Sequence, residues 1–158
     1  MATLGELYET DINYYVRLNF TSLIEIVDIL GGVDVYSDYA FNTGWESGYE
    51  MAVSEGYNHF NGQQALAFCR ERHNLVDGDN QRGRNQQAVI TAMLKKVLSP
   101  TMLLKAGSIL NQVGEGVETN ISQGQLNSLV KYQLSTGAEW TIQSVAATGF
   151  DGEDYPYS

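Results

Sequence analysis

The chain has 158 residues, of which 43% are apolar, so it can form one packed domain and lacks the composition of a disordered chain. Its net charge of −10 repels phosphate, which argues against a nucleic-acid-binding protein. No stretch approaches the roughly 18 apolar residues of a membrane helix, and the first ten residues lack the basic start of a signal peptide, so we expect any membrane anchor to lie outside this sequence.

The first half of the chain alternates extended and helical patterns. Asn13–Phe20 is aromatic and β-branched, which predicts a strand, and Thr21 and Ser22 can cap a helix that follows it. Gly31 and Gly32 end this helix, because glycine tolerates the left-handed conformation of a closing residue. The elements expected here are a helix at 2–9, a strand at 13–20, a helix up to residue 30, a strand at 33–36, a long loop or irregular hairpin at 37–60 with a strand near 49–53, and a short helix at 61–67.

The second half is mostly helical. Asn80–Leu98 has a strong helical pattern, Pro100 suits the first turn of a further helix, and Ser122 with Gln125 forms a capping-box pattern. The elements expected here are an extended segment at 68–72, helices at 80–98, 101–113 and 122–134, and a strand at 140–147. Strands that alternate with helices indicate a layered α/β fold in a single domain over residues 1–158.

Arginine is concentrated in one short segment. Four of the nine basic residues fall within fifteen positions, and these are Arg70, Arg72, Arg82 and Arg84. Each guanidinium presents a planar set of donors that matches phosphate oxygens. If residues 68–72 are extended, Arg70 and Arg72 share a face and can reach one ligand. An acidic chain with one arginine cluster therefore predicts a local anion site.

The helix that begins near Asn80 is predicted to aim some of these side chains inward. At about 100° per residue, Asp79, Arg82 and Gln86 project toward the expected buried stripe, whereas Arg84 projects toward solvent. The residues expected in that stripe are Val89, Ile90, Met93, Leu94 and Val97. The amino-terminus of the helix adds backbone donors and partial positive charge.

Two interpretations of Asp79 and Arg82 are open from the residues alone. They can form a structural ion pair at the helix start, with Asp79 as the cap, because a buried arginine and a buried carboxylate are costly unless paired. Alternatively, three arginines near one carboxylate leave excess positive charge, which a phosphate or pyrophosphate ligand would neutralise, with Gln86 as a neutral donor.

Five segments carry motifs in a fixed order. Residues 14–20 read Tyr-Tyr-Val-Arg-Leu-Asn-Phe, residues 26–35 contain Val-Asp-x-Leu-Gly-Gly-Val, and residues 61–72 contain Gly-x-x-Ala-Leu-x-aromatic-x-Arg-x-Arg. Residues 79–86 carry Asp-x-x-Arg-x-x-x-Gln, and residues 119–122 carry Thr-Asn-apolar-Ser. In this order and at this spacing, the segments resemble the LytR-CpsA-Psr family over nearly the whole chain.

The resemblance implies a three-layer α/β/α fold with a central mixed sheet. It also implies an enzyme on the extracytoplasmic face of the bacterial cell membrane, a phosphotransferase assisted by Mg²⁺. Such an enzyme moves a glycopolymer, of the teichoic acid or capsular polysaccharide type, from a polyprenyl pyrophosphate carrier to a peptidoglycan acceptor. The membrane is approached through the lipid carrier and an anchor, and no nucleic acid is expected as a partner.

The motifs also assign roles to residues of this chain. Asp79 is expected to orient arginines or to help activate the acceptor hydroxyl, and it belongs with Arg70, Arg72 and Arg82 to the implied catalytic set. The residues implied to bind the pyrophosphate are Arg70, Arg72, Arg82, Gln86 and Arg17.

The chain departs from the family pattern in two respects. Many members have a second arginine directly before the motif glutamine, whereas Asn85 stands there in this chain and Arg84 projects from a different face. The family's amino-terminal portion, with the anchor and most of the implied Mg²⁺ ligands, is not in this sequence, and no metal motif is present. We therefore expect a truncated domain that lacks part of the site.

Three other functions compete with the transferase. The chain could be a non-catalytic polyprenyl-phosphate-binding or regulatory module, a polyprenyl pyrophosphate phosphatase that uses the same site, or a structural fragment whose arginines pair internally. Lipid-phosphate binding separates the structural fragment from the other two, and product analysis separates transferase from phosphatase. Cys69, the only cysteine, is expected to be a small core residue.

Overall fold

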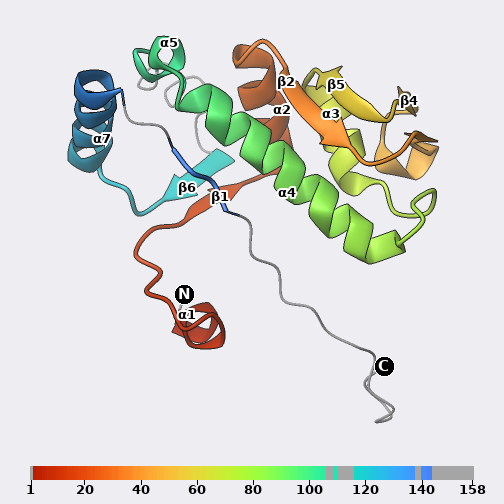
Figure 1. Cartoon of the computed structure of the whole chain (residues 1–158), viewed down its shortest axis with the longest axis horizontal. Helices are drawn as coiled ribbons and strands as arrows, with labels where there is room; N and C mark the ends of the chain where they lie inside the picture. Colours follow the sequence, from red (N-terminus) through yellow and green to blue (C-terminus); the bar gives the residue numbers. More distant parts are fainter. Residues whose placement is uncertain (1, 106–108, 110–115, 138–139, 144–158) are drawn as a thin grey trace.

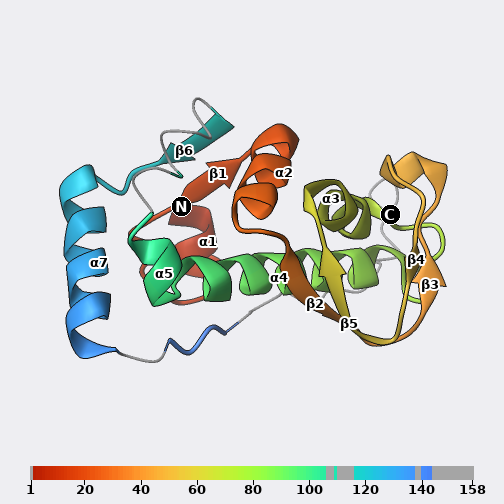
Figure 2. The same ribbon diagram turned by 90° about the horizontal axis from the view of Figure 1, so that it is seen from above.

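The computed structural model describes residues 2–105, 109, 116–137 and 140–143. Its elements are α1 (Ala2–Leu7), β1 (Val16–Leu18), α2 (Phe20–Ile29), β2 (Val33–Ser37), β3 (Phe41–Asn42), the 3₁₀ turn η1 (Trp45–Ser47), β4 (Ala52–Val53), β5 (Gly56–Phe60), α3 (Gly62–Arg70), α4 (Gly78–Val97), α5 (Pro100–Leu103), β6 (Val117–Thr119) and α7 (Gln123–Thr136). Helix α4 runs across the molecule, and the other elements are arranged along it (Figure 1). Seen from above, α3 and the β2–β5 ribbon lie beside its amino-terminal half, and α7 lies beyond its other end (Figure 2).

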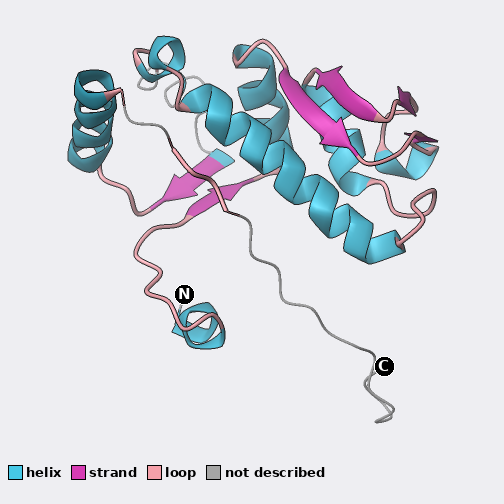
Figure 3. Cartoon of the chain, in the orientation of Figure 1, coloured by secondary structure: helices cyan, strands magenta, loops and turns pink. Residues whose placement is uncertain are grey.

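The strands pair as three separate two-stranded antiparallel sheets, which are β1–β6, β2–β5 and β3–β4. The chain contains both helices and strands, so the predicted α/β class is confirmed (Figure 3). Within the described residues every strand pair is antiparallel. The central mixed sheet that the resemblance implied is not seen in this part of the chain. Residues 140–143 of the expected strand at 140–147 are not a strand, and 144–147 lie outside the described residues.

The segment 37–60, expected as a long loop or irregular hairpin, contains three strands and a 3₁₀ turn, and β3 and β4 pair antiparallel within it. Strand β5 pairs with β2 through five residue pairs, from Val33 opposite Phe60 to Ser37 opposite Gly56. The strand expected near 49–53 is the two-residue β4. Glycine, asparagine and tyrosine are spread through this segment, so its alternation of buried and exposed residues emerges only once β2 is known to lie beside it.

Helix α2 begins earlier than its pattern suggested. Its cap is Asn19, whose Oδ1 accepts a hydrogen bond from the backbone N–H of Ser22 at 2.8 Å, rather than Thr21 or Ser22. The preceding strand is correspondingly short and ends at Leu18. At the far end, Gly31 and Gly32 have φ angles of 73° and 83°, which confirms that glycine closes this helix.

Helix α3 starts directly against α2. A Cβ at Gly62 would lie 2.3 Å from the backbone oxygen of Ile24, so only glycine allows this approach. Oδ1 of Asp28 accepts a hydrogen bond from the Gly62 N–H at 2.7 Å and ties the two helices together. Further along α3, the fully buried Phe68 ring packs on Phe60, with ring centroids 5.3 Å apart, and forms part of the core between α2, α3, α4 and the β2–β5 ribbon.

The last third of the described chain was predicted in part. The capping box of Ser122 and Gln125 is present, and α7 follows it to Thr136. Of the helix expected at 101–113, the structure shows α5 and a helical Ile109, and residues 106–108 and 110–113 lie outside the described residues. Strand β6 was not predicted, because three residues carry too little pattern to reveal a strand without its partner β1. Among the described residues, no helix is both long and apolar enough to cross a membrane.

Candidate functional site

Arg70 lies in the last turn of α3, so the extended conformation predicted for residues 68–72 is wrong for residues 68–70. The helix is opened by a capping box of Asn61 and Gln64, and burial of Phe68 and Cys69 holds it helical as far as Arg70. The guanidinium of Arg70 lies over the ring of Phe20, 5.5 Å from its centroid. It also donates a hydrogen bond to the backbone oxygen of Glu46 at 3.4 Å.

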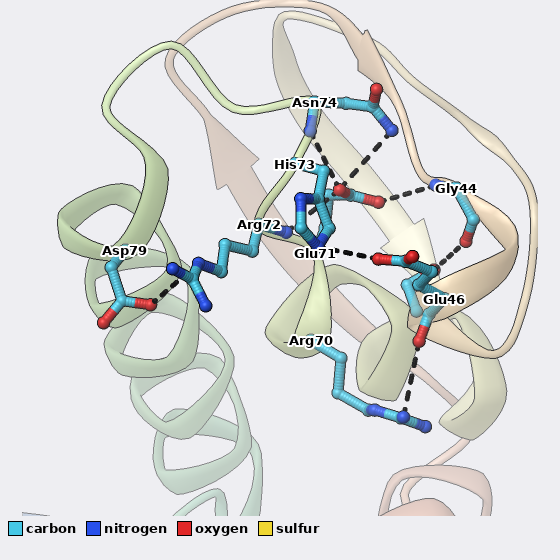
Figure 4. Close-up of polar contacts among 9 residues, drawn as sticks. Gly44, Glu46, Arg70, Glu71, Arg72, His73, Asn74 and Asp79 are labelled. Atoms are coloured by element: carbon cyan, nitrogen blue, oxygen red, sulfur yellow. Dashed lines mark hydrogen bonds and ion pairs between the residues drawn. The ribbon is translucent and has the colours of Figure 1, made fainter.

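Arg72 lies just beyond the helix and points in another direction. Its side chain extends toward Asp79 at the start of α4, whereas Arg70 extends toward η1 (Figure 4). The two arginines therefore do not share a strand face in this structure. Their separation follows from Glu71, the C-cap residue of α3, whose backbone is extended at φ −58° and ψ 137°.

Asp79 joins two arginines from different segments. Its Oδ1 lies 2.7 Å from Nη2 of Arg82 on α4 and 3.7 Å from Nε of Arg72. The predicted pairing of Asp79 with Arg82 is therefore present, but both carboxylate and guanidinium are accessible, with 60% and 36% of their side-chain surface exposed. The cap of α4 is Asp77 rather than Asp79, which lies in the first turn of the helix.

The buried face of α4 is rotated from the predicted one. Its buried residues are Gln81, Asn85, Val89 and Met93, whereas Ile90 and Leu94 are 51% and 42% exposed. Asp79 and Gln86 are exposed as well, so the inward direction predicted for them is wrong.

The rotation has a physical cause at the end of α3. The last carbonyls of a helix have no partner within it. Asn85 donates to the backbone oxygen of Phe68 at 3.5 Å, and Gln86 donates to that of Cys69 at 3.2 Å. Gln81 in turn donates to Asn85 at 3.0 Å, so the buried side-chain amides of this helix face have hydrogen-bond partners.

Arg84 is separate from the other three arginines, as predicted. Its Nη2 lies 2.6 Å from Oδ2 of Asp77 and 2.6 Å from Oε1 of Gln81, and half of its side chain is exposed. The hydrogen bond from Arg84 holds the pKa of the Asp77 carboxyl below its usual value. Asn85 occupies the position where many family members carry arginine, and in this chain it is buried and bonded within the fold.

A pocket of about 430 Å³ lies beside Arg70. Its lining residues are Arg17, Leu18, Asn19, Phe20, Gly116 and Glu118. Phe20 forms part of this pocket and also carries the Arg70 guanidinium on its ring, so pocket and arginine cluster adjoin. Arg17 pairs with Glu118 at 3.2 Å across the β1–β6 sheet.

Glu71 is the main residue of this region that the sequence did not reveal. It is 3% exposed, and its carboxylate accepts four hydrogen bonds from Gly44, Arg72 and Asn74 (Figure 4). Burial acts to raise the pKa of the Glu71 carboxyl, but the hydrogen bonds from backbone N–H groups and from Asn74 outweigh it, and the pKa is lowered. No sequence signal marks the residue, because its partner Gly44 lies 27 positions away.

Arg70, Arg72 and Arg82 differ in their charged partners. Within the part of the chain that the structure describes, Asp79 is the one carboxylate paired with Arg72 and Arg82, and Arg70 has only a carbonyl and an aromatic ring as partners. Arg72 and Arg82 thus share one carboxylate beside the amino-terminus of α4, which itself favours anions.

The described residues do not fit a metal site. No group of three or more His, Cys, Asp or Glu side chains among them is arranged to hold a metal ion. Asp79, the carboxylate of the arginine cluster, is already bonded to two guanidiniums. Mg²⁺ therefore stays a prediction of the family resemblance, and its ligands are not assigned to this chain.

Two curated proteins are similar to this chain in sequence. The polyisoprenyl-teichoic acid–peptidoglycan teichoic acid transferase TagU of Bacillus mycoides (strain KBAB4) is 36% identical over 131 residues, which cover 83% of this chain and 41% of that protein. Biofilm regulatory protein A of Streptococcus mutans serotype c is 31% identical over 159 residues, which cover 97% of this chain and 39% of that protein. The chain thus spans about two fifths of the length of these curated relatives.

A solved structure shows the same fold. The crystal structure of B. subtilis TagV superposes with a TM-score of 0.68 at 26% identity, over 85% of this chain and 51% of that one. The LytR_cpsA_psr family model matches residues 1–155, nearly the whole sequence. Taken with the arginine motifs and their arrangement at the start of α4, this match shows that the chain belongs to the LytR-CpsA-Psr family.

Proposed function

We propose that this chain forms the pyrophosphate-binding part of an enzyme that transfers a glycopolymer from a polyprenyl pyrophosphate carrier to peptidoglycan. The observation that carries the proposal is the set of three arginines, Arg70, Arg72 and Arg82. Two of them share the carboxylate of Asp79, and Arg70 pairs with no carboxylate within the described residues. The relative TagU is named as a polyisoprenyl-teichoic acid–peptidoglycan teichoic acid transferase, which supports the substrate class. The enzyme would work at the extracytoplasmic face of the membrane, where carrier and acceptor meet.

The proposed reaction is a phosphoryl transfer. A hydroxyl oxygen of the peptidoglycan acceptor attacks the phosphorus that bears the glycopolymer, and a new P–O bond forms. The bond from this phosphorus to the bridging oxygen breaks, the polyprenyl monophosphate leaves, and the hydroxyl proton passes to solvent. Such a step depends on positioning and charge neutralisation, which guanidiniums supply.

The structure suggests a division of roles among the site residues. Arg70 and Arg82 bind the diphosphate oxygens, and Arg72 adds a third guanidinium from the loop after α3. Asp79 orients Arg82 and Arg72, since its Oδ1 contacts both. Gln86 and Arg17 lie at the edges of this group: Gln86 is bonded to the end of α3, and Arg17 lines the adjoining pocket. No step is assigned to Mg²⁺.

Titration with geranylgeranyl pyrophosphate, a short polyprenyl pyrophosphate, tests the proposal. Arg82→Ala and Arg70→Ala should each weaken binding by about 1.5–3 kcal/mol, the contribution of a charged hydrogen bond. Arg84→Ala is the matched control, because Arg84 lies on the same helix but pairs with Asp77 and Gln81 instead. Circular dichroism would establish that each variant is folded. Equal affinities for Arg82→Ala and Arg84→Ala would refute a diphosphate site at this cluster.

The products of the reaction distinguish a transferase from the competing phosphatase. The released polyprenyl monophosphate should depend on added peptidoglycan for a transferase, and the glycopolymer should become attached to that peptidoglycan. Release that is independent of the acceptor, with free glycopolymer phosphate as the other product, would show hydrolysis instead. Binding without either product would identify a non-catalytic module.

A further inference from the structure

Glu71 stands between Arg70 and Arg72 in the sequence but pairs with neither guanidinium within the described residues. It is almost fully buried, and a buried carboxylate is costly unless its charge is compensated. Its compensation comes from N–H donors, three of them on the main chain. Within the described residues, neither flanking arginine therefore forms an ion pair with this carboxylate.

The two oxygens of Glu71 hold two different segments. Oε1 accepts from the backbone N–H of Arg72 at 2.9 Å and of Asn74 at 3.0 Å, and from Nδ2 of Asn74 at 3.4 Å. This oxygen therefore fixes the turn from which the Arg72 side chain leaves. Oε2 accepts from the backbone N–H of Gly44 at 2.6 Å, directly before η1.

The segment fixed by Oε2 supports Arg70. Glu46, within η1, offers the backbone oxygen that accepts the Arg70 hydrogen bond, and its carboxylate lies 2.7 Å from Nε2 of His73 (Figure 4). On the other side of η1, a Cβ at Gly48 would lie 3.2 Å from Nη1 of Arg70, so this turn packs closely on the guanidinium. The position of Arg70 thus depends on a turn that Glu71 anchors.

We infer that Glu71 is a positioning residue for the arginine cluster. It binds no ligand itself, but it sets where the Arg70 and Arg72 guanidiniums lie by anchoring the 44–48 turn and the 72–74 turn to the end of α3. Because its carboxylate binds N–H groups, it orders the site without pairing with either guanidinium. This inference rests on the proposed pyrophosphate-binding function.

Two carboxylates of this chain allow a matched comparison. Asp28 accepts the backbone N–H of Gly62 at the start of α3, and Glu71 accepts backbone N–H groups at its end. Asp28→Asn and Glu71→Gln each replace a charged acceptor by a neutral amide, so both should lower the free energy of unfolding in urea. Only Glu71→Gln should change the positions of the Arg70 and Arg72 guanidiniums. We expect it to weaken binding of both geranylgeranyl pyrophosphate and inorganic pyrophosphate about tenfold, as when one charged hydrogen bond is weakened.

Further readouts separate positioning from a general loss of stability. In Glu71→Gln, hydrogen exchange should accelerate at the amides of Gly44, Arg72 and Asn74, and in Asp28→Asn it should accelerate at Gly62 instead. Glu71→Asp keeps the charge with a shorter side chain and should recover part of the affinity. Gly44→Ala is a second test if Glu71→Gln fails to fold, because its Cβ would crowd Asn74 Nδ2 at 3.2 Å, a group that also binds Glu71, while the carboxylate remains. It should weaken pyrophosphate binding in the same direction.

The results distinguish this inference from the proposed function. If Arg82→Ala weakens binding but Glu71→Gln binds as tightly as the unchanged chain, the inference is overturned and the binding site stands. Equal weakening by Asp28→Asn would also overturn it, since the effect would then follow stability alone. If the unchanged, folded chain binds no pyrophosphate, the proposed function and the inference fall together.

Discussion

Oδ1 of Asp79 lies 2.7 Å from Nη2 of Arg82, one turn further along α4. The same oxygen reaches Arg72, so one carboxylate links the loop after α3 to the start of α4. Asp79, Arg72 and Arg82 are all accessible. An anionic ligand can therefore approach both guanidiniums while Asp79 remains paired with them. The contact therefore bears more on ligand binding than on stability.

Asp79→Asn should change stability little and affinity more. An exposed ion pair in the first turn of a helix contributes below about 1 kcal/mol to the free energy of unfolding. Without the shared anchor, Arg72 and Arg82 move independently, so we expect weaker binding of geranylgeranyl pyrophosphate. Asp77→Asn is the control: it disrupts the neighbouring pair with Arg84 at 2.6 Å and should leave the affinity unchanged. Tighter binding by Asp79→Asn would show that Asp79 competes with the ligand instead of orienting its partners.

Two glycine substitutions should have opposite effects on stability. Gly62→Ala places a Cβ 2.3 Å from a backbone oxygen of α2 and should destabilise the fold by about 1–3 kcal/mol, as overpacking does. A Cβ at Gly83, inside α4, would have no neighbouring atom within 4 Å, so Gly83→Ala should stabilise the fold by up to about 1 kcal/mol. Urea unfolding of both variants measures this. Similar effects of the two substitutions would contradict the close contact of α3 with α2.

Cys69 should be unreactive in the folded chain. Burial raises the pKa of its thiol to about 12, so almost no nucleophilic thiolate is present near neutral pH. Iodoacetamide labelling followed by mass spectrometry should show slow modification in buffer and rapid modification in urea. Rapid labelling of the native chain would mean that the end of α3 opens readily.

The lowered pKa of Glu71 predicts a specific pH dependence of the free energy of unfolding. Its pKa in the folded chain is lowered from about 4.5, so the carboxylate contributes stability above that value and loses it as the pH falls through the folded pKa. The difference in unfolding free energy between the unchanged chain and Glu71→Gln should therefore be largest near neutral pH and shrink in acid. Urea titrations at a series of pH values measure this difference. A difference that stays constant into strong acid would show that the charge of Glu71 is irrelevant to stability.

Local patterns were sufficient for much of the fold. The capping box of Ser122 and Gln125 and the glycines at 31 and 32 identified where helices begin and end, because their hydrogen bonds and backbone angles involve only near neighbours in the chain. The arginine motifs likewise marked the segment of the candidate site before any contact was known. Strand β5 was missed, since its pairing with β2 joins residues up to 27 positions apart.

Periodicity failed where polar groups pack against polar groups. The expected buried stripe of α4 relied on apolar residues, and it included Ile90 and Leu94, which are exposed. The actual stripe turns toward Gln81 and Asn85, because the carbonyls at the end of α3 require donors and this helix supplies them. That requirement arises only when α3 and α4 lie together.

The sequence by itself determined the family, the α/β class and which arginines to examine, because motif spacing and helix capping are local properties of the chain. Only the tertiary structure decided which way those arginines point, since Arg70 is set by η1 and Arg72 by Asp79, residues from other segments. It also revealed Glu71, whose role depends on a backbone N–H at Gly44 that folding brings to its carboxylate.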